Sequence, residues 1–133
     1  MCSSDLAASD GADERQVMDL EVWQRYASPV WFDIRRTDVL NARIARDDQD
    51  EKHICPPQLE VIRRAVQLWS NPGEVVGSWF GGIGSEPYVA LEQGRRAVAI
   101  ELKAAYYQQM VKNCESICEK QSQGTLLDFM RGE

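Results

Sequence analysis

A glycine-rich turn and the acidic residue that follows it are the residues of this 133-residue sequence best suited to chemistry. The turn is Gly81-Gly82-Ile83-Gly84, and Glu101 stands 17 residues after Gly84. Glycines permit positive φ and close approach of a ligand, and a helix that starts behind them offers free N–H groups to polar or anionic groups. A carboxylate at the end of the next strand can accept hydrogen bonds from ribose hydroxyls. The pair therefore indicates a site for a cofactor that contains a nucleoside.

Three classes of cofactor compete for such a site. A Walker A loop needs Gly-Lys-Ser or Gly-Lys-Thr, which the sequence lacks, so a P-loop NTPase is disfavoured. A dinucleotide fingerprint needs a third small residue where Pro87 stands, which weakens a nicotinamide or flavin interpretation but leaves it open. S-adenosylmethionine has a ribose and no pyrophosphate, so it does not need that residue.

The elements that must position these residues follow from the hydrophobic pattern. An apolar stripe at spacings of three and four after Pro56-Pro57 predicts a helix of about 12 residues; the stripe is Leu59, Ile62, Ala65/Val66 and Trp69. A β-branched run from Glu74 toward Phe80 predicts a strand. The apolar run Ala97–Ile100 predicts a second strand that is buried on both faces.

Helices are expected after each of these strands. Tyr88–Gln93 is predicted as a short helix with Ser85 as its cap and Gly94 as its end. A longer helix is predicted from Lys103 to about Lys120, with Tyr107, Met110/Val111, Cys114 and Ile117/Cys118 as its apolar stripe. The tail, residues 124–133, is a candidate for one more strand. Alternating strands and helices favour an α/β fold with a small parallel sheet, of about three strands, flanked by helices.

Composition and charge set the class of protein and its divisions. With 44% hydrophobic and 27% charged residues, the chain is neither wholly disordered nor a membrane protein, and no apolar run approaches the roughly 20 residues of a membrane span. Residues 1–22 hold six acids and one base, so they carry −5 of the net charge of −6. We expect a disordered acidic leader over residues 1–20, a linker that could contact DNA over residues 21–52, and a cofactor-binding subdomain over residues 53–133.

Four segments carry a resemblance to a known family. They are His53-Ile54-Cys55-Pro56, Leu68 to Val76, Phe80 to Glu86, and Gly94 to Lys103. In this order they resemble the C-terminal half of a DNA amino-methyltransferase of the phage-type, site-specific adenine or cytosine-N4 group, in which the catalytic half comes first. The resemblance implies a partial Rossmann-like, S-adenosylmethionine-dependent methyltransferase fold. It extends from about Tyr26 to Asn113.

The resemblance also implies roles for individual residues. Phe80, Gly82 and Gly84 match the Phe-x-Gly-x-Gly loop around the methionine moiety of S-adenosylmethionine, with Ser85 directly behind it. Glu101 matches the acid that binds the ribose hydroxyls. His53 and Pro56 match the segment that closes over the methionine end.

Departures from the family pattern concern both cofactor and catalysis. Trp79 stands where the family has Pro before Phe80, and Gly77 replaces a large apolar residue, which weakens strand packing. Family members act through an Asp/Asn/Ser-Pro-Pro-aromatic segment that holds a flipped base. The only Pro-Pro here, Pro56-Pro57, lies between Cys55 and Gln58, and Ser28-Pro29-Val30-Trp31 lacks the second Pro. We therefore expect no catalytic residue in this sequence.

The expected function is that of a DNA N-methyltransferase, with adenine as the preferred target base, or of the truncated C-terminal part of such an enzyme. The alternative is a non-catalytic remnant or accessory module that binds cofactor or DNA. DNA is the expected partner, with a separate chain as the source of the catalytic half; neither membrane nor metal is expected. Candidate contacts to the DNA backbone are Arg35, Arg36, Arg43 and Arg46. Sparse cysteines favour a reduced compartment, the cytoplasm of a bacterial or phage-infected cell, and Cys114 and Cys118 are expected to be core thiols.

Overall fold

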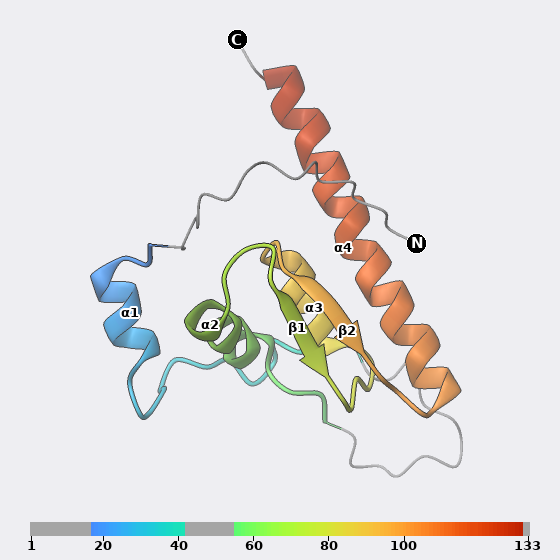
Figure 1. Cartoon of the computed structure of the whole chain (residues 1–133), viewed down its shortest axis with the longest axis horizontal. Coiled ribbons are helices and arrows are strands. Elements are labelled where there is room, and N and C mark those ends of the chain that lie inside the picture. Colours follow the sequence, from blue (N-terminus) through green and yellow to red (C-terminus); the bar gives the residue numbers. More distant parts are fainter. Residues whose placement is uncertain (1–16, 42–54, 132–133) are drawn as a thin grey trace.

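The computed structural model of the chain describes residues 17–41 and 55–131 (Figure 1). Six elements follow one another in this part of the chain: α1 (Leu20–Tyr26), α2 (Leu59–Trp69), β1 (Val75–Ser78), α3 (Ser85–Glu92), β2 (Arg96–Ala99) and α4 (Ala104–Arg131). From α2 onward, this is the predicted order of helices and strands. Residues 1–16 of the expected leader lie outside the described part, and so does the stretch 42–54.

The sheet consists, in the described ranges, of two parallel strands. Val75 pairs with Arg96 and Ser78 with Ala99, and Figure 1 shows α2 on the β1 side and α4 on the β2 side. The predicted α/β fold with a small parallel sheet flanked by helices is confirmed. The expected third strand is absent from the described residues.

The two faces of the sheet differ, which corrects one prediction. Val76, Ala97 and Ala99 are half-buried on the face that α3 covers. On the other face Val98 is 57% exposed, so β2 is not buried on both faces. Parallel strands become buried on both sides only where helices cover both faces, and the described helices cover one.

The main core lies between α2 and α3. Leu59, Ile62 and Val66 of α2 pack with Val89, whose side chain is fully buried. The predicted stripe holds for the first two turns but is wrong for Trp69, which is 76% exposed. The core cluster with α3 includes α2 residues only as far as Val66, and Trp69 lies beyond it.

The ends of α3 and α4 depart from the prediction. Helix α3 begins at Ser85, and its N-cap is Gly84 at φ +92°, so Ser85 is not the cap. Gly94 ends this region as predicted, with φ +73° and its N–H on Leu91 O at 3.1 Å. Helix α4 continues to Arg131, so no strand forms in the tail. Each added residue extends an existing helix at little cost, whereas a strand needs a partner edge.

Along α4, the predicted stripe is only partly buried. Met110 and Ile117 are buried, whereas Tyr107 is 51% exposed and Val111 36% exposed. The two cysteines on this side, Cys114 and Cys118, are half-buried thiols. Burial raises the pKa of Cys114 to about 11, which leaves its thiol protonated and unreactive near neutral pH.

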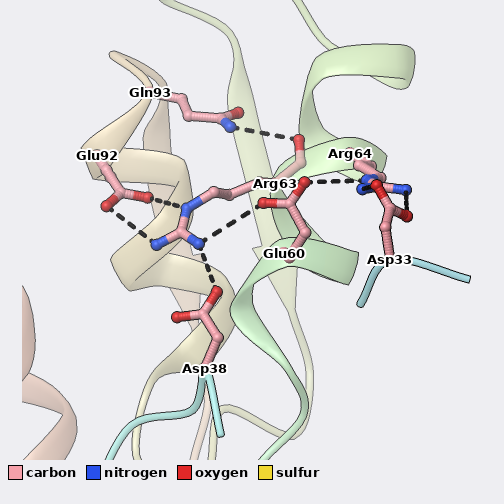
Figure 2. Close-up of polar contacts among 7 residues, drawn as sticks. All are labelled: Asp33, Asp38, Glu60, Arg63, Arg64, Glu92 and Gln93. Atoms are coloured by element: carbon pink, nitrogen blue, oxygen red, sulfur yellow. Dashed lines mark hydrogen bonds and ion pairs between the residues drawn. The ribbon is translucent and has the colours of Figure 1, made fainter. Parts of the chain in front are cut away.

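An arm formed by residues 20–38 is fixed to α2 by two adjacent arginines, as Figure 2 shows. The Arg64 side chain is 2% exposed and holds both carboxylate oxygens of Asp33, at 2.9 and 2.7 Å, together with Glu60. Its guanidinium also lies over the rings of Tyr26 and Trp31, 4.9 and 5.2 Å from their centroids. Such a paired and stacked guanidinium compensates for its own desolvation.

The second arginine joins three elements. Arg63 Nη1 binds Asp38 and its Nε binds Glu92 of α3, both at 2.7 Å. Asp38 O also accepts the first N–H of α2, from Leu59 at 2.8 Å. The pairing holds the pKa of Arg63 above its usual range, mainly through the hydrogen bond to Glu92. The arm, α2 and α3 are thus locked together at one end of the core.

Candidate functional site

The turn between β1 and α3 requires glycine at three of its positions. Gly82 and Gly84 have φ of +53° and +92°, a region that residues with a Cβ rarely adopt. A Cβ on Gly81 would lie 2.9 Å from Met110 Sδ, and one on Gly84 would lie 2.7 Å from Met110 Cγ. The turn therefore packs directly on α4, which leaves no room for side chains at these two points. Space is open beside Gly82, where a Cβ would meet nothing within 4 Å.

Glu101 meets this turn. Its Oε2 accepts the Gly82 N–H at 2.7 Å, and its Oε1 accepts the Lys103 N–H at 2.8 Å. The strands bring the two loops together, because Gly81 N–H donates to Ile100 O at 2.8 Å. The sequence paired Glu101 with the glycine turn, and the structure places both at the carboxyl ends of the strands. This is the edge at which open α/β sheets bind their ligands.

The carboxylate of Glu101 keeps acceptor capacity beyond these two bonds. A carboxylate has about four lone-pair positions, and two are used here by backbone N–H groups. The side chain is half-buried, so its remaining positions face partly toward solvent. It can therefore accept hydrogen bonds from two neighbouring hydroxyl groups of a ligand without giving up the turn.

The other residues expected around the turn have different environments. Phe80 is 91% exposed and Trp79 is 72% exposed, so two aromatic rings stand free at the end of β1. Ser85 is 2% exposed and forms part of the first turn of α3. Pro56 is half-buried in the segment that leads into α2. His53 lies outside the described residues.

Two of the four candidate DNA contacts lie among the described residues. Arg35 and Arg36 are described and exposed, whereas Arg43 and Arg46 fall in the stretch that is not described. Arg35 lines an open polar cleft of about 550 Å³ together with Arg25, Thr37 and the ion-paired side chains of the arm and α2. This cleft was not foreseen in the sequence, where Arg63-Arg64 three and four residues after Glu60 was its one signal.

Two further segments are structural in this fold. Arg95 is only 5% exposed, because its guanidinium donates to Ser70 O at 2.7 Å and closes the C-terminus of α2. Burial lowers its pKa. In Ser28-Pro29-Val30-Trp31, the hydroxyl of Ser28 donates to Val30 O at 2.9 Å and the Trp31 indole donates to Tyr26 O at 3.0 Å. These groups stabilise the end of α1.

No group of three or more metal-ligating side chains occurs among the described residues. No described helix has both the length and the apolar composition that a membrane crossing requires.

Fold and site together define a partial Rossmann-like α/β domain with a glycine turn and an acidic residue at the carboxyl ends of its strands. The DNA methylase family matches residues 7–112. Because this match spans most of the sequence, the chain belongs to that family, the N6/N4 DNA methylases. No curated protein matches the chain.

The fold is similar to that of a Thermus thermophilus protein assigned as a DNA modification methylase. The structure of that protein complexed with S-adenosyl-L-methionine is 24% identical, with a TM-score of 0.60, and the match covers 83% of this chain and 39% of that one. Its selenomethionine derivative is 25% identical, with a TM-score of 0.59, and the match covers 82% and 41%. This chain thus spans about two fifths of the length of the solved methylase.

Proposed function

We propose that this chain binds S-adenosylmethionine and supplies the methyl-donor half of a DNA N-methyltransferase. The observation that carries the proposal is the 2.7 Å hydrogen bond between Gly82 N–H and Glu101, which joins the glycine turn to the acid at one sheet edge. Family membership and the likeness to a methylase solved with S-adenosyl-L-methionine support the choice of cofactor. When bound, this cofactor supplies an activated methyl group.

The residues present fit such a ligand. Glu101 is half-buried with unused lone pairs for the two ribose hydroxyls, and the space beside Gly82 lets the ligand approach the backbone. The exposed ring of Phe80 can pack against the methionine portion or the adenine. His53 and Pro56 would close the methionine end from the segment before α2, and Ser85 would fix the start of α3 behind the loop.

The proposed substrate is DNA, with an exocyclic amine as the methyl acceptor and adenine N6 preferred to cytosine N4. Arg35 and Arg36, both exposed on the arm, would contact backbone phosphates, with Arg43 and Arg46 extending the surface. Such contacts make binding strongly dependent on salt. The compartment proposed is the cytoplasm of a bacterial or phage-infected cell, where DNA is accessible and the cysteines stay reduced.

The residues that would hold the flipped base are not found in this sequence, so we propose that another polypeptide segment provides the Asp-Pro-Pro-Tyr type motif. A second candidate function follows from the same observation. The chain could act as a non-catalytic module that binds cofactor or DNA without transferring a methyl group. Assay of methyl transfer from radiolabelled S-adenosylmethionine to DNA, with and without a chain that carries the motif, separates the two.

Calorimetric titration of the purified chain with S-adenosylmethionine tests the proposal. Glu101→Ala removes a charge-assisted acceptor and should weaken binding by roughly 1.5–3 kcal/mol, about 10-fold to 150-fold. Glu119→Ala is the matched control, because Glu119 is an exposed carboxylate of α4 and should bind like the parent chain. Absence of binding in the parent chain, or equal loss in both variants, would contradict the proposal.

A further inference from the structure

One amide side chain of α4, Asn113, contacts the glycine turn, a second one, Gln109, contacts Asn113, and the proposed function uses neither. Asn113 Nδ2 donates to the main-chain oxygen of Ile83 at 2.8 Å. Gln109 Nε2 donates in turn to Asn113 Oδ1 at 3.0 Å, and Gln109 is 9% exposed. The second bond fixes which end of the Asn113 amide faces the turn, because its oxygen is already engaged.

The bond to Ile83 completes the restraint of two peptide groups. Gly84 N–H donates to Gly81 O at 2.7 Å, so the Ile83–Gly84 peptide is held through its oxygen by Asn113 and through its N–H by Gly81. The Gly81–Gly82 peptide is held through its oxygen by Gly84 and through its N–H by Glu101. Two side chains from outside the turn, Asn113 and Glu101, thus complete this pattern.

The turn needs such restraint because its own residues offer little. Gly82 and Gly84 are at positive φ, and glycine loses more conformational freedom on ordering than any other residue. Ile83 is 6% exposed and packs against Leu40 and Tyr106, which fixes its side chain. The direction of its carbonyl is set by Asn113.

We propose that Asn113, oriented by Gln109, is a positioning residue for the methyl-donor site, which it preorganises by fixing the Ile83–Gly84 peptide. This inference rests on the proposed function for its ligand. A ligand that binds an ordered loop does not have to order it, so the removal of Asn113 weakens binding without removing any group that touches the ligand.

Gln121 offers a matched control in the same helix. Its Nε2 donates to the main-chain oxygen of Leu91 in α3 at 2.9 Å. The two bonds are therefore of one type, from an α4 amide to a backbone carbonyl, but only that of Asn113 reaches the glycine turn. A general role of such bonds in packing α4 would affect both variants alike.

The experiment compares Asn113→Ala, Asn113→Asp and Gln121→Ala with the parent chain. It measures S-adenosylmethionine affinity by calorimetry and hydrogen exchange of the Gly82 and Gly84 amides by NMR without ligand. Asn113→Ala should weaken binding about threefold to tenfold, the effect of one lost hydrogen bond, and should speed exchange at Gly84. Asn113→Asp should lose at least as much, because a carboxylate would face the Ile83 oxygen without a donor. Gln121→Ala should change neither quantity.

Two results would overturn the inference: an Asn113→Ala chain that binds and exchanges like the parent, or a Gln121→Ala chain with the same losses. Thermal unfolding of each variant shows whether it is folded; if Asn113→Ala is not, the Asp variant and Gln109→Ala carry the comparison. If the parent chain does not bind S-adenosylmethionine, the proposed function fails. Exchange at Gly84 then decides by itself whether Asn113 positions the turn.

Discussion

Substitution of alanine for glycine should destabilise the protein by different amounts at different positions of the glycine turn. Gly82 and Gly84 both have positive φ, but only at Gly84 would a Cβ collide with another side chain, Met110. Gly82→Ala should therefore cost only the left-handed strain, about 1–2 kcal/mol. Gly84→Ala should cost about 2–5 kcal/mol, because overpacking adds to that strain. Urea unfolding of the two variants measures this difference. Equal midpoints would contradict the packing of the turn on α4.

The sequence was sufficient to predict the glycine turn and Glu101, because a glycine-rich turn after one strand and an acidic residue at the end of the next have the spacing of a βαβ unit. It did not predict Asn113. An Asn and a Gln four residues apart on a polar helix face are typical of a solvated surface, and only the fold shows that this face meets the turn. Arg64 was missed for a related reason, because arginine is almost never fully buried unless it is paired, and its partner Asp33 is 31 residues away.

At the scale of elements, the arm is attached to α2 chiefly through Arg64. Arg64→Ala should cost about 2–3 kcal/mol, less than a fully buried pair because Asp33 is half-exposed. The loss should appear as local release of α1 and of Trp31. Hydrogen exchange over residues 20–38 and Trp fluorescence measure it. Arg96→Ala, at an exposed arginine of β2, is the control, and an unchanged arm in Arg64→Ala would refute this attachment.

The attachment of the arm should also depend on pH. The hydrogen bond from Arg64 lowers the pKa of Asp33 below its ordinary value of 3.8. A carboxyl group whose pKa is depressed in the folded state adds stability above its unfolded pKa, which is about 4, and loses it as pH falls through the folded value. The NMR signal of the Trp31 indole N–H should therefore report arm release below about pH 4. In Asp33→Asn the same signal should lack this step; a step that persists there would assign it to another group.

Strand β1 contains a residue that is unfavourable in strands. Gly77 stands inside it, and a Cβ there would meet nothing within 4 Å. Since its φ is not in the left-handed region, Gly77→Thr should stabilise the strand by about 0.5–1 kcal/mol. Thermal unfolding measures this gain. A destabilised variant would show that this face of β1 is covered.

At the scale of the whole molecule, the open sheet face predicts association. Val75, Val98 and Ile100 are 51%, 57% and 47% exposed on a sheet of two described strands, and such a sheet is marginal without further cover. We expect the purified 133-residue chain to self-associate as its concentration rises, or to have a low thermal unfolding temperature. Sedimentation velocity across concentrations measures this, and Val98→Lys should reduce it. A clean monomer with a cooperative, high-temperature transition would contradict the expectation.

The fold could be predicted from sequence where its periodicity is local, and not where tertiary contacts decide. The α2–β1–α3–β2–α4 order followed from apolar spacing and from Gly and Pro positions. The exposure of Val98 and Trp69 did not, because an apolar residue marks a face that can be buried and cannot show whether a partner covers it. Helix α4 continues through Gly124 to Arg131. Glycine is unfavourable inside a helix, and the residue pattern of the tail did not show whether the helix would end there.

The central claim is that one ligand bridges the glycine turn and Glu101. NMR titration of the full chain with S-adenosylhomocysteine, the demethylated product form, tests it most directly, because each backbone amide reports its own surroundings. The amide signals of Gly82, Gly84 and Lys103 should shift most, and the shifts should saturate together at one ligand per chain. Shifts centred on the Arg25–Arg35 cleft would contradict the claim. So would the absence of shifts in this chain at a ligand concentration that saturates a solved methylase titrated in parallel.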